Sequence, residues 1–188
     1  MDQLWAPWRM AYLESGATAA GGCFLCALGR GGIDAPPAAA GDRSAGHPPH
    51  AAAPDDALDI VIWRGVRVYA LLNAYPYANG HVMVAPYAHE GALDALDDPT
   101  AAELMAATRL IIRALRQAYQ PQGFNVGANL GVAAGAGFGD HVHLHIVPRW
   151  GGDTNFMTTT GQARVIPEAL ADTAERLRAA VAVIAGEA

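Results

Sequence analysis

Three histidines alternate with branched apolar residues in the stretch His141-Val142-His143-Leu144-His145-Ile146-Val147-Pro148. Successive side chains of a β-strand point to opposite faces, so the three imidazoles are expected to line one face while the apolar residues enter a core. Near neutral pH, histidine can be a nucleophile, an acid–base group or a metal ligand. The stretch therefore predicts a strand built around a reaction site. A polar strand face that is rich in histidine by chance is the simpler alternative.

The segments around this stretch predict the rest of a sheet. Two apolar runs flank Arg64-Gly65 and indicate a β-hairpin. A short apolar run ends at Pro86, and two later strands are joined by a segment rich in glycine and alanine. The five predicted strands cover 60–63, 66–72, 82–85, 124–130 and 141–148.

Two helices are expected beside the sheet. Asp98 is a good N-cap with Pro99 at the first helical position, and Pro121-Gln122-Gly123 ends this helix near Tyr119. Pro167 opens the second helix. The residues expected to face inward are Leu104, Ile111, Ile112 and Leu115 in the first helix and Leu170, Leu177, Val181 and Ile184 in the second. Together the elements predict an α+β domain with a mainly antiparallel sheet of about five strands and two main helices.

Size and composition favour one domain. The chain has 188 residues, and 52% of them are hydrophobic, although many of these are alanine. We expect an N-terminal arm over 1–28, a flexible loop rich in Gly, Ala and Pro over 29–56, and the core with its C-terminal helix over 57–188. The net charge of −6 and the lack of a basic stripe exclude a long nucleic acid as partner. With no secretory signal and no membrane span in the sequence, we expect a cytoplasmic protein without membrane contact.

The two cysteines of the chain, Cys23 and Cys26, are spaced so that both can bind one tetrahedral metal ion. Zinc needs two more ligands, and the candidates are His89 and His141. A redox pair and two free structural thiols are the alternatives. A site closed by four protein ligands would be structural, and its effect on chemistry would be indirect, because holding His141 would aim His143.

A glycine-rich segment over 131–139 precedes the histidine stretch directly. Small residues let backbone N–H groups approach an anion closely, although a plain flexible connection has the same composition. Asn73 and Asn129 each end a predicted strand. A carboxamide suits ribose hydroxyls or a phosphate edge, whereas the ordinary interpretation of such an asparagine is a turn or cap residue.

With these residues in view, the chain resembles the histidine triad (HIT) superfamily. The stretch 141–147 matches the triad motif fully, and the segment 79–86 followed by His89 is similar to the second signature of the family. Several further segments are similar to the bacterial diadenosine tetraphosphate phosphorylase-like branch. They are 4–9, 72–77, 123–127, 148–150 and 152–156.

The resemblance implies a HIT-like fold and a role for each site residue. His143 matches the nucleophile that attacks the α-phosphorus, and His145 matches the histidine that contacts phosphate and helps the leaving group depart. His81 matches a motif histidine close to the active site, and Asn73 lies where the family contacts ribose. The resemblance further implies a structural zinc ion on Cys23, Cys26, His89 and His141. The residues that match phosphate contacts are Asn129, Gly135, Gly137, Phe138 and Gly139.

The implied activity is cleavage of a dinucleoside polyphosphate through a nucleotidyl-histidine intermediate. Phosphorolysis of diadenosine tetraphosphate to ADP and ATP, with orthophosphate as acceptor, is the leading hypothesis. A Hint-like hydrolase of nucleoside phosphoramidates or acyl adenylates and a non-catalytic nucleotide- and zinc-binding module are the alternatives. The loop before the histidine stretch departs from the family pattern in a way that affects rate and substrate choice. Many relatives carry a serine in this loop, whereas this chain has none, and Asp140 adds negative charge there. The family also implies a homodimer or a higher homo-oligomer.

Overall fold

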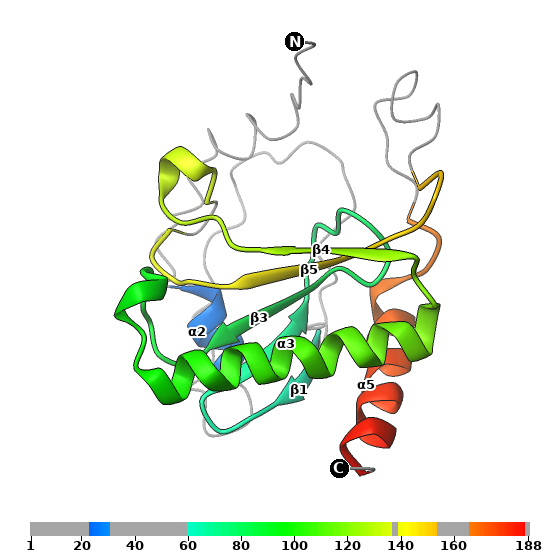
Figure 1. Ribbon diagram of the computed structural model, residues 1–188, viewed down its shortest axis with the longest axis horizontal. Helices are drawn as coiled ribbons and strands as arrows, with labels where there is room; N and C mark the ends of the chain where they lie inside the picture. The colour runs from blue at the N-terminus through cyan, green and yellow to red at the C-terminus, as the bar shows by residue number, and fades with distance from the viewer. Residues whose placement is uncertain (1–22, 31–59, 137–138, 154–165, 187–188) are drawn as a thin grey trace, which may run out of the picture.

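The computed structural model describes residues 23–30, 60–136, 139–153 and 166–186 (Figure 1). Most of the predicted arm, nearly all of the predicted 29–56 loop, and the site candidates Gly137 and Phe138 lie outside these residues, so the predicted division of the chain stays a prediction. None of the described helices is long and apolar enough to cross a membrane. The location of the protein in the cell stays a prediction as well.

Five antiparallel strands form one sheet in the order β1-β2-β3-β5-β4. The predicted hairpin pairs the first two strands, and the chain then crosses to the far edge before β5 fills the place between β3 and β4. The expected sheet is thereby confirmed. The strands are β1 (Val61–Arg64), β2 (Val68–Leu72), β3 (Val82–Pro86), β4 (Gly123–Gly127) and β5 (Leu144–Arg149).

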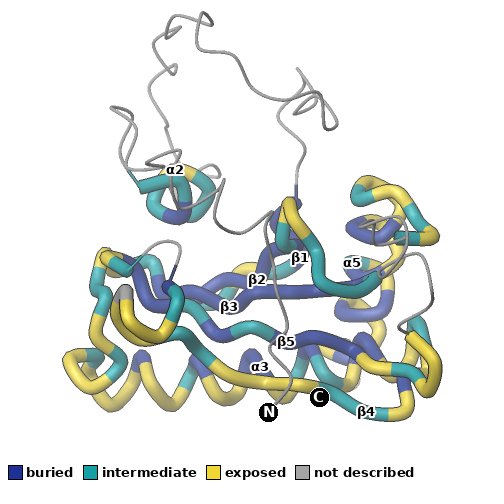
Figure 2. Tube along the Cα trace, turned by 90° about the horizontal axis from the view of Figure 1, so that it is seen from above, coloured by how far each residue is buried: buried dark blue, intermediate teal, exposed yellow. Residues whose placement is uncertain are grey.

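Two long helices cover one face of the sheet (Figure 1). Helix α3 (Asp98–Tyr119) packs on β2, β3 and β5, and α5 (Leu170–Gly186) packs on α3 and β1. Figure 2 looks onto the opposite face, and it shows β2 and β3 as buried along their whole length. The core lies between the sheet and these helices. It includes Leu104, Ile111, Leu115, Ile146, Leu177, Val181 and Ile184.

A third helix, α2 (Phe24–Arg30), was not expected. Leu25 is fully buried, and its carbonyl accepts a hydrogen bond of 2.6 Å from the Tyr69 hydroxyl. The Arg64 guanidinium donates to the carbonyls of Leu28 and Gly29 at 3.0 and 2.8 Å, which satisfies acceptors at the end of the helix. These contacts fix a short helix, and with it the cysteine pair, beside the sheet.

Several predicted boundaries differ from the structure. The N-cap of α3 is Asp97 and not Asp98, because the Asp97 carboxylate accepts the Thr100 N–H at 2.8 Å. Helix α5 begins at Leu170 rather than Pro167, and Ile112 of α3 is only half-buried. Strand β4 ends at Gly127, three residues earlier than expected. Strand β5 begins at Leu144, so two of the three histidines precede it.

Candidate functional site

A backbone carbonyl fixes the tautomer of His143. Its Nδ1 atom lies 2.9 Å from the carbonyl oxygen of His141. A carbonyl oxygen only accepts, so Nδ1 carries the proton and Nε2 holds a lone pair. Burial lowers the pKa of His143 below 6.5, although the hydrogen bond to the carbonyl partly opposes this shift. Near neutral pH, the side chain is therefore a neutral imidazole with an unprotonated Nε2.

A second chain of hydrogen bonds fixes the opposite tautomer on His145. The backbone N–H of Tyr77 donates to Nδ1 of His81 at 3.1 Å, so the proton of a neutral His81 is on Nε2. That atom lies 3.0 Å from Nδ1 of His145, which must accept, and the proton of His145 is therefore on its Nε2. Burial, with smaller contributions from His145 and His143, lowers the pKa of His81 to about 3, which keeps its ring neutral.

The rings of His143 and His145 meet edge to face, with centroids 4.9 Å apart. One ring thus presents a lone pair, and its neighbour presents an N–H. A nucleophile next to a hydrogen-bond donor is the pair that a displacement at phosphorus requires, because negative charge builds up on the leaving oxygen as the bond to it breaks.

The loop that carries His81 is tied to α3 and α5 through Glu168. Its carboxylate accepts hydrogen bonds from Tyr119 Oη, from Thr173 Oγ1 at 3.0 Å and from Asn79 Nδ2 at 3.3 Å. Burial raises the pKa of Glu168, but the hydrogen bonds outweigh burial and hold the pKa below its ordinary value. The charged carboxylate therefore holds Asn79, two residues before the imidazole, against the helices.

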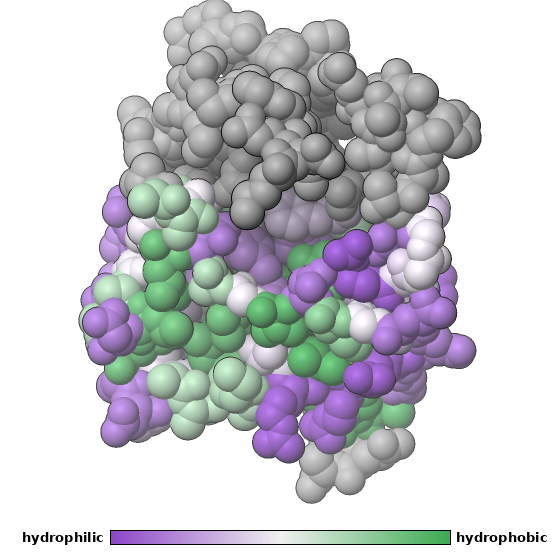
Figure 3. Space-filling view, turned by 45° about the horizontal axis from the view of Figure 1, so that its top comes forward, coloured by the Kyte–Doolittle hydropathy of each residue, from purple (hydrophilic) through white to green (hydrophobic). Residues whose placement is uncertain are grey.

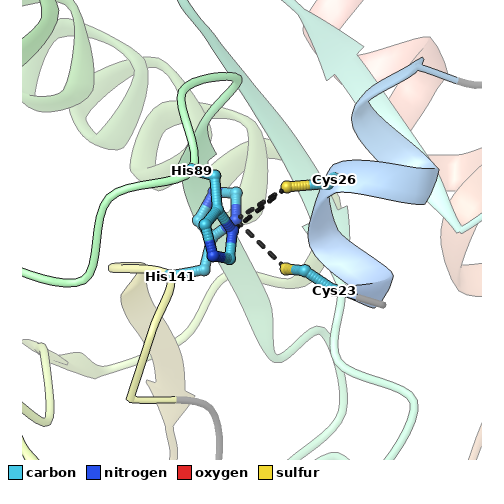
Figure 4. Close-up of side chains that lie close together, drawn as sticks. All are labelled: Cys23, Cys26, His89 and His141. Atoms are coloured by element: carbon cyan, nitrogen blue, oxygen red, sulfur yellow. Dashed lines mark hydrogen bonds between the residues drawn. The ribbon is translucent and has the colours of Figure 1, made fainter. Parts of the chain in front are cut away.

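The four predicted metal ligands converge at one place (Figure 4). Cys23 directly precedes α2, Cys26 lies in its first turn, His89 follows β3, and His141 precedes β5. The Sγ of Cys23 lies 3.3 Å from Nδ1 of His141, and the Sγ of Cys26 lies 3.3 Å from Nδ1 of His89. All four ligand atoms lie within 4.8 Å of one another. Nε2 of His141 lies 2.9 Å from the Pro86 carbonyl and donates to it, so its Nδ1 lone pair faces the sulfurs.

No disulfide joins the two described cysteines. Each sulfur instead faces an imidazole nitrogen, and the redox alternative offers no reason for that convergence. The cluster has the donor set of a closed tetrahedral metal site.

The predicted nucleotide-contacting residues are only partly brought together. Asn129 lies with His145 on a cavity of about 460 Å³, and its Nδ2 donates to the Gly135 carbonyl at 3.4 Å. The Oδ1 of Asn73 accepts the Tyr75 N–H at 2.9 Å, which is the turn geometry that was the alternative interpretation. Asn73, Gly135 and Gly139 do not line the cavity.

Three residues with polar side chains that line this cavity were missed by the sequence analysis, namely Tyr77, Asn125 and Arg149. The alternation along β5 contains the signal for one of them. Arg149 follows His145 by four residues on the same strand and therefore lies on the same face of the sheet. Tyr77 lies on a loop and Asn125 on a strand without a strong pattern, so their places depend on the register.

The fold and the histidine geometry define a class, and comparison with known proteins gives the same answer. The family model described as "HIT domain" matches residues 57–152. The chain belongs to the HIT, or histidine triad, family.

Individual relatives extend the similarity beyond that domain. The chain is 41% identical over 177 residues to a Mycobacterium tuberculosis protein named AP-4-A phosphorylase, covering 92% of this chain and 80% of the relative. It is 32% identical over 80 residues to the adenosine 5'-monophosphoramidase hnt1 of Schizosaccharomyces pombe, covering 43% and 56%. A crystal structure of a Zn-bound histidine triad family protein from Mycobacterium smegmatis superposes with a TM-score of 0.63 at 26% identity, covering 92% of this chain and all of that one.

Proposed function

We propose that the protein is an enzyme that cleaves dinucleoside polyphosphates, with diadenosine tetraphosphate as the leading substrate and orthophosphate as acceptor. The observation that carries the proposal is the pair of fixed tautomers, with a lone pair on Nε2 of His143 beside an N–H on Nε2 of His145. The 41% identity to a protein named AP-4-A phosphorylase supports the substrate class.

The reaction runs in two displacements. Nε2 of His143 attacks the α-phosphorus, an N–P bond forms, and the bond from that phosphorus to the bridging oxygen breaks. The N–H of His145 donates a hydrogen bond to the departing oxygen and stabilises its negative charge, so ATP leaves and an adenylyl group stays on His143. An oxygen of orthophosphate then attacks the same phosphorus, the N–P bond breaks, and ADP is released with the lone pair restored to Nε2.

His81 acts as a positioning residue in this scheme. It is 1% exposed and has no room to contact a substrate directly. Its two hydrogen bonds set which nitrogen of His145 carries the proton, so it acts on the reaction through that ring.

We further propose that Asn129 and backbone N–H groups of the 135–139 loop contact the phosphates, with Gly135, Gly137, Phe138 and Gly139 contributing, and that Asn73 contacts ribose. Gly135 has a φ of 81°, a conformation that suits glycine and lets the backbone turn sharply. Backbone donors would then replace the serine that this loop lacks. Asp140 is exposed, which favours screening of its charge by solvent.

We propose zinc as the metal of the cysteine–histidine cluster. Zn–S bonds of about 2.3 Å and Zn–N bonds of about 2.0 Å in a tetrahedron place sulfur and nitrogen about 3.5 Å apart. The distances of 3.3 Å and 3.5 Å between Cys26 Sγ and the two Nδ1 atoms fit that geometry. When bound, zinc would supply folding free energy, and through His141 it would hold the carbonyl that orients His143.

A homodimer is proposed for the chain. Strand β4 is the outermost strand of the described sheet, and Val126 on it is 45% exposed. Met105 of α3 and Leu130 after β4 are also exposed, and Figure 3 shows a band of hydrophobic surface across the face that α3 and β4 present. An unpaired strand edge beside apolar surface favours association with a second copy.

The product assay separates the proposed function from its rivals. With diadenosine tetraphosphate, we expect ATP and ADP only when orthophosphate is present. ATP and AMP formed from water alone would make the protein a hydrolase, which the similarity to hnt1 keeps as the second candidate.

A second measurement addresses the intermediate. Rapid quenching with a substrate labelled at the α-phosphorus should trap an acid-labile adenylyl group on the wild-type protein and none on His143→Asn, whose turnover should fall on the order of a thousandfold or more. Comparison of thermal unfolding and zinc content controls for folding. Wild-type turnover in the His143→Asn variant would refute the nucleophile, and tight nucleotide binding without turnover in the wild type would indicate a non-catalytic module.

A further inference from the structure

We propose that the groove over β4 and β5, running from His145 to Arg149, binds the second nucleoside of a dinucleoside polyphosphate, with the Arg149 guanidinium as its platform. We call this surface the distal groove; Asn125 and Gly127 of β4 border it. The inference rests on the proposed function, because it concerns the part of the substrate that leaves.

The register of the two strands builds the groove. Gly127 pairs with His145, Asn125 with Val147 and Gly123 with Arg149, so alternate residues of both strands face the same side. A Cβ added at Gly127 or Gly123 would meet no atom within 4 Å. The edge strand therefore leaves space beside the catalytic ring and at the far end of the groove. The cavity of about 460 Å³ lies within the size range of small-molecule sites, about 300–1,000 Å³.

The far end of the groove carries a pre-organised arginine. Nε and one terminal nitrogen of Arg149 donate to the Asp153 carboxylate, the latter bond at 3.0 Å, and the other terminal nitrogen donates to Asn125 Oδ1 at 2.8 Å. The side chain is nevertheless 47% exposed. Three hydrogen bonds hold the planar guanidinium in one orientation, and such a plane stacks on nucleic-acid bases at little entropic cost.

The distance along β5 from His145 to Arg149 places this platform at the position of a second nucleoside. Four residues of strand separate Arg149 from His145, which is roughly 13 Å at about 3.3 Å per residue. The phosphates that follow the scissile bond occupy the nearer part of that span, beside Gly127.

Charge distinguishes a nucleoside from a terminal phosphate at the far end. Among the described residues that line the cavity, Arg149 has the one permanently charged side chain, and its charge is already paired with Asp153. A free phosphate would meet that carboxylate, and the repulsion disfavours it. A neutral base or ribose avoids the repulsion, and its amino or hydroxyl groups can donate to the carboxylate.

The test compares diadenosine tetraphosphate with adenosine 5'-tetraphosphate, which has the same phosphates and lacks the second nucleoside. In the wild type, kcat/KM should favour the dinucleotide on the order of tenfold, a ratio that one stacked cationic contact supplies. The charge-balanced double variant Arg149→Gln with Asp153→Asn should bring the ratio close to one. The loss in kcat/KM should be larger for diadenosine tetraphosphate than for adenosine 5'-tetraphosphate. Asn125→Ala, at an exposed position, should move the ratio in the same direction. Arg113→Gln, on the exposed face of α3, is the matched control and should leave the ratio unchanged.

The outcomes separate this inference from the proposed function. Equal kcat/KM for both compounds in the wild type, or a larger loss for adenosine 5'-tetraphosphate in the double variant, overturns the distal groove while the proposed function stands. A wild type that cleaves neither compound contradicts the proposed function. In that case, calorimetric titration of both compounds into His143→Asn decides on the groove, since a dinucleotide affinity about tenfold higher supports it and equal affinities overturn it.

Discussion

Replacing His81 with glutamine should flatten the acid dependence of folding stability. The buried imidazole has a pKa of about 3 in the folded protein and an ordinary value of 6.5 in the unfolded chain. Since the unfolded state binds the proton more tightly, protonation of this residue favours unfolding. Its contribution to folding stability is complete above pH 6.5 and is lost as the pH falls from 6.5 towards 3. The glutamine side chain can accept the Tyr77 N–H and donate to His145, but it does not titrate.

The expected magnitude follows from the two pKa values. At about pH 4.5, two units below the unfolded value and above the folded one, the wild type should have lost about 2.5 kcal/mol relative to neutral pH through this residue. At this pH the loss depends mainly on the pKa of the residue in the unfolded chain. The exact pKa in the folded protein has little effect, because the pH is still above it.

Urea unfolding, followed by tryptophan fluorescence, gives the free energy of unfolding of each protein at neutral pH and at about pH 4.5. The effect is the difference between the losses that the wild type and the variant show between these pH values. Other groups that titrate in this range, metal ligands included, contribute to both proteins and cancel. His81→Gln should be less stable than the wild type at neutral pH by about 1 kcal/mol and should match or exceed it at the lower pH. If the two proteins lose the same free energy between these pH values, the fold does not hold His81 in the neutral state.

The remaining predictions concern the metal, the nucleophile and the strand edge. Cys26→Ser should lower bound zinc, measured by atomic absorption, together with the melting temperature, and equal zinc content in variant and wild type would remove this ligand from the site. On the acid side of the pH profile, the midpoint of kcat/KM should lie below pH 6.5, because the lowered pKa of His143 keeps Nε2 unprotonated to lower pH. A midpoint above that value would contradict the described environment. Val126→Lys should shift the protein from dimer to monomer in sedimentation equilibrium, whereas a wild type that is already monomeric would refute the proposed interface.

The sequence predicted the sheet well because its signals are local and strong. The apolar runs of β2 and β3 and the hairpin at Arg64-Gly65 can be recognised from neighbouring residues alone, without information from the rest of the chain. Adjacent aspartates illustrate the limit of such signals. Asp97 and Asp98 are equally good caps by type, and only the geometry of the first turn decides which carboxylate reaches the Thr100 N–H.

Elements that depend on distant partners could not be predicted in this way. Helix α2 has seven residues, too few to be stable alone, and it depends on burial of Leu25 and on the Arg64 guanidinium, which lies 35 and 36 residues from the two carbonyls that it binds. The start of β5 is a similar case. His141 is drawn towards the Pro86 carbonyl and the two cysteines, so regular pairing with β3 begins only at Leu144.

The chemistry of the site depends on groups that no residue type encodes. The triad motif names the imidazoles, but their tautomers are set by the carbonyls of Pro86 and His141 and by the N–H of Tyr77. Every residue offers a carbonyl, and all but proline an N–H, so the motif alone cannot say which nitrogen of each ring carries the proton. The fold supplies that information by bringing β3, the loop before it and the segment before β5 together. A HIT chain that kept the three histidines but moved one of these backbone groups would keep the motif and lose the pairing of lone pair and proton on which the proposed displacement depends.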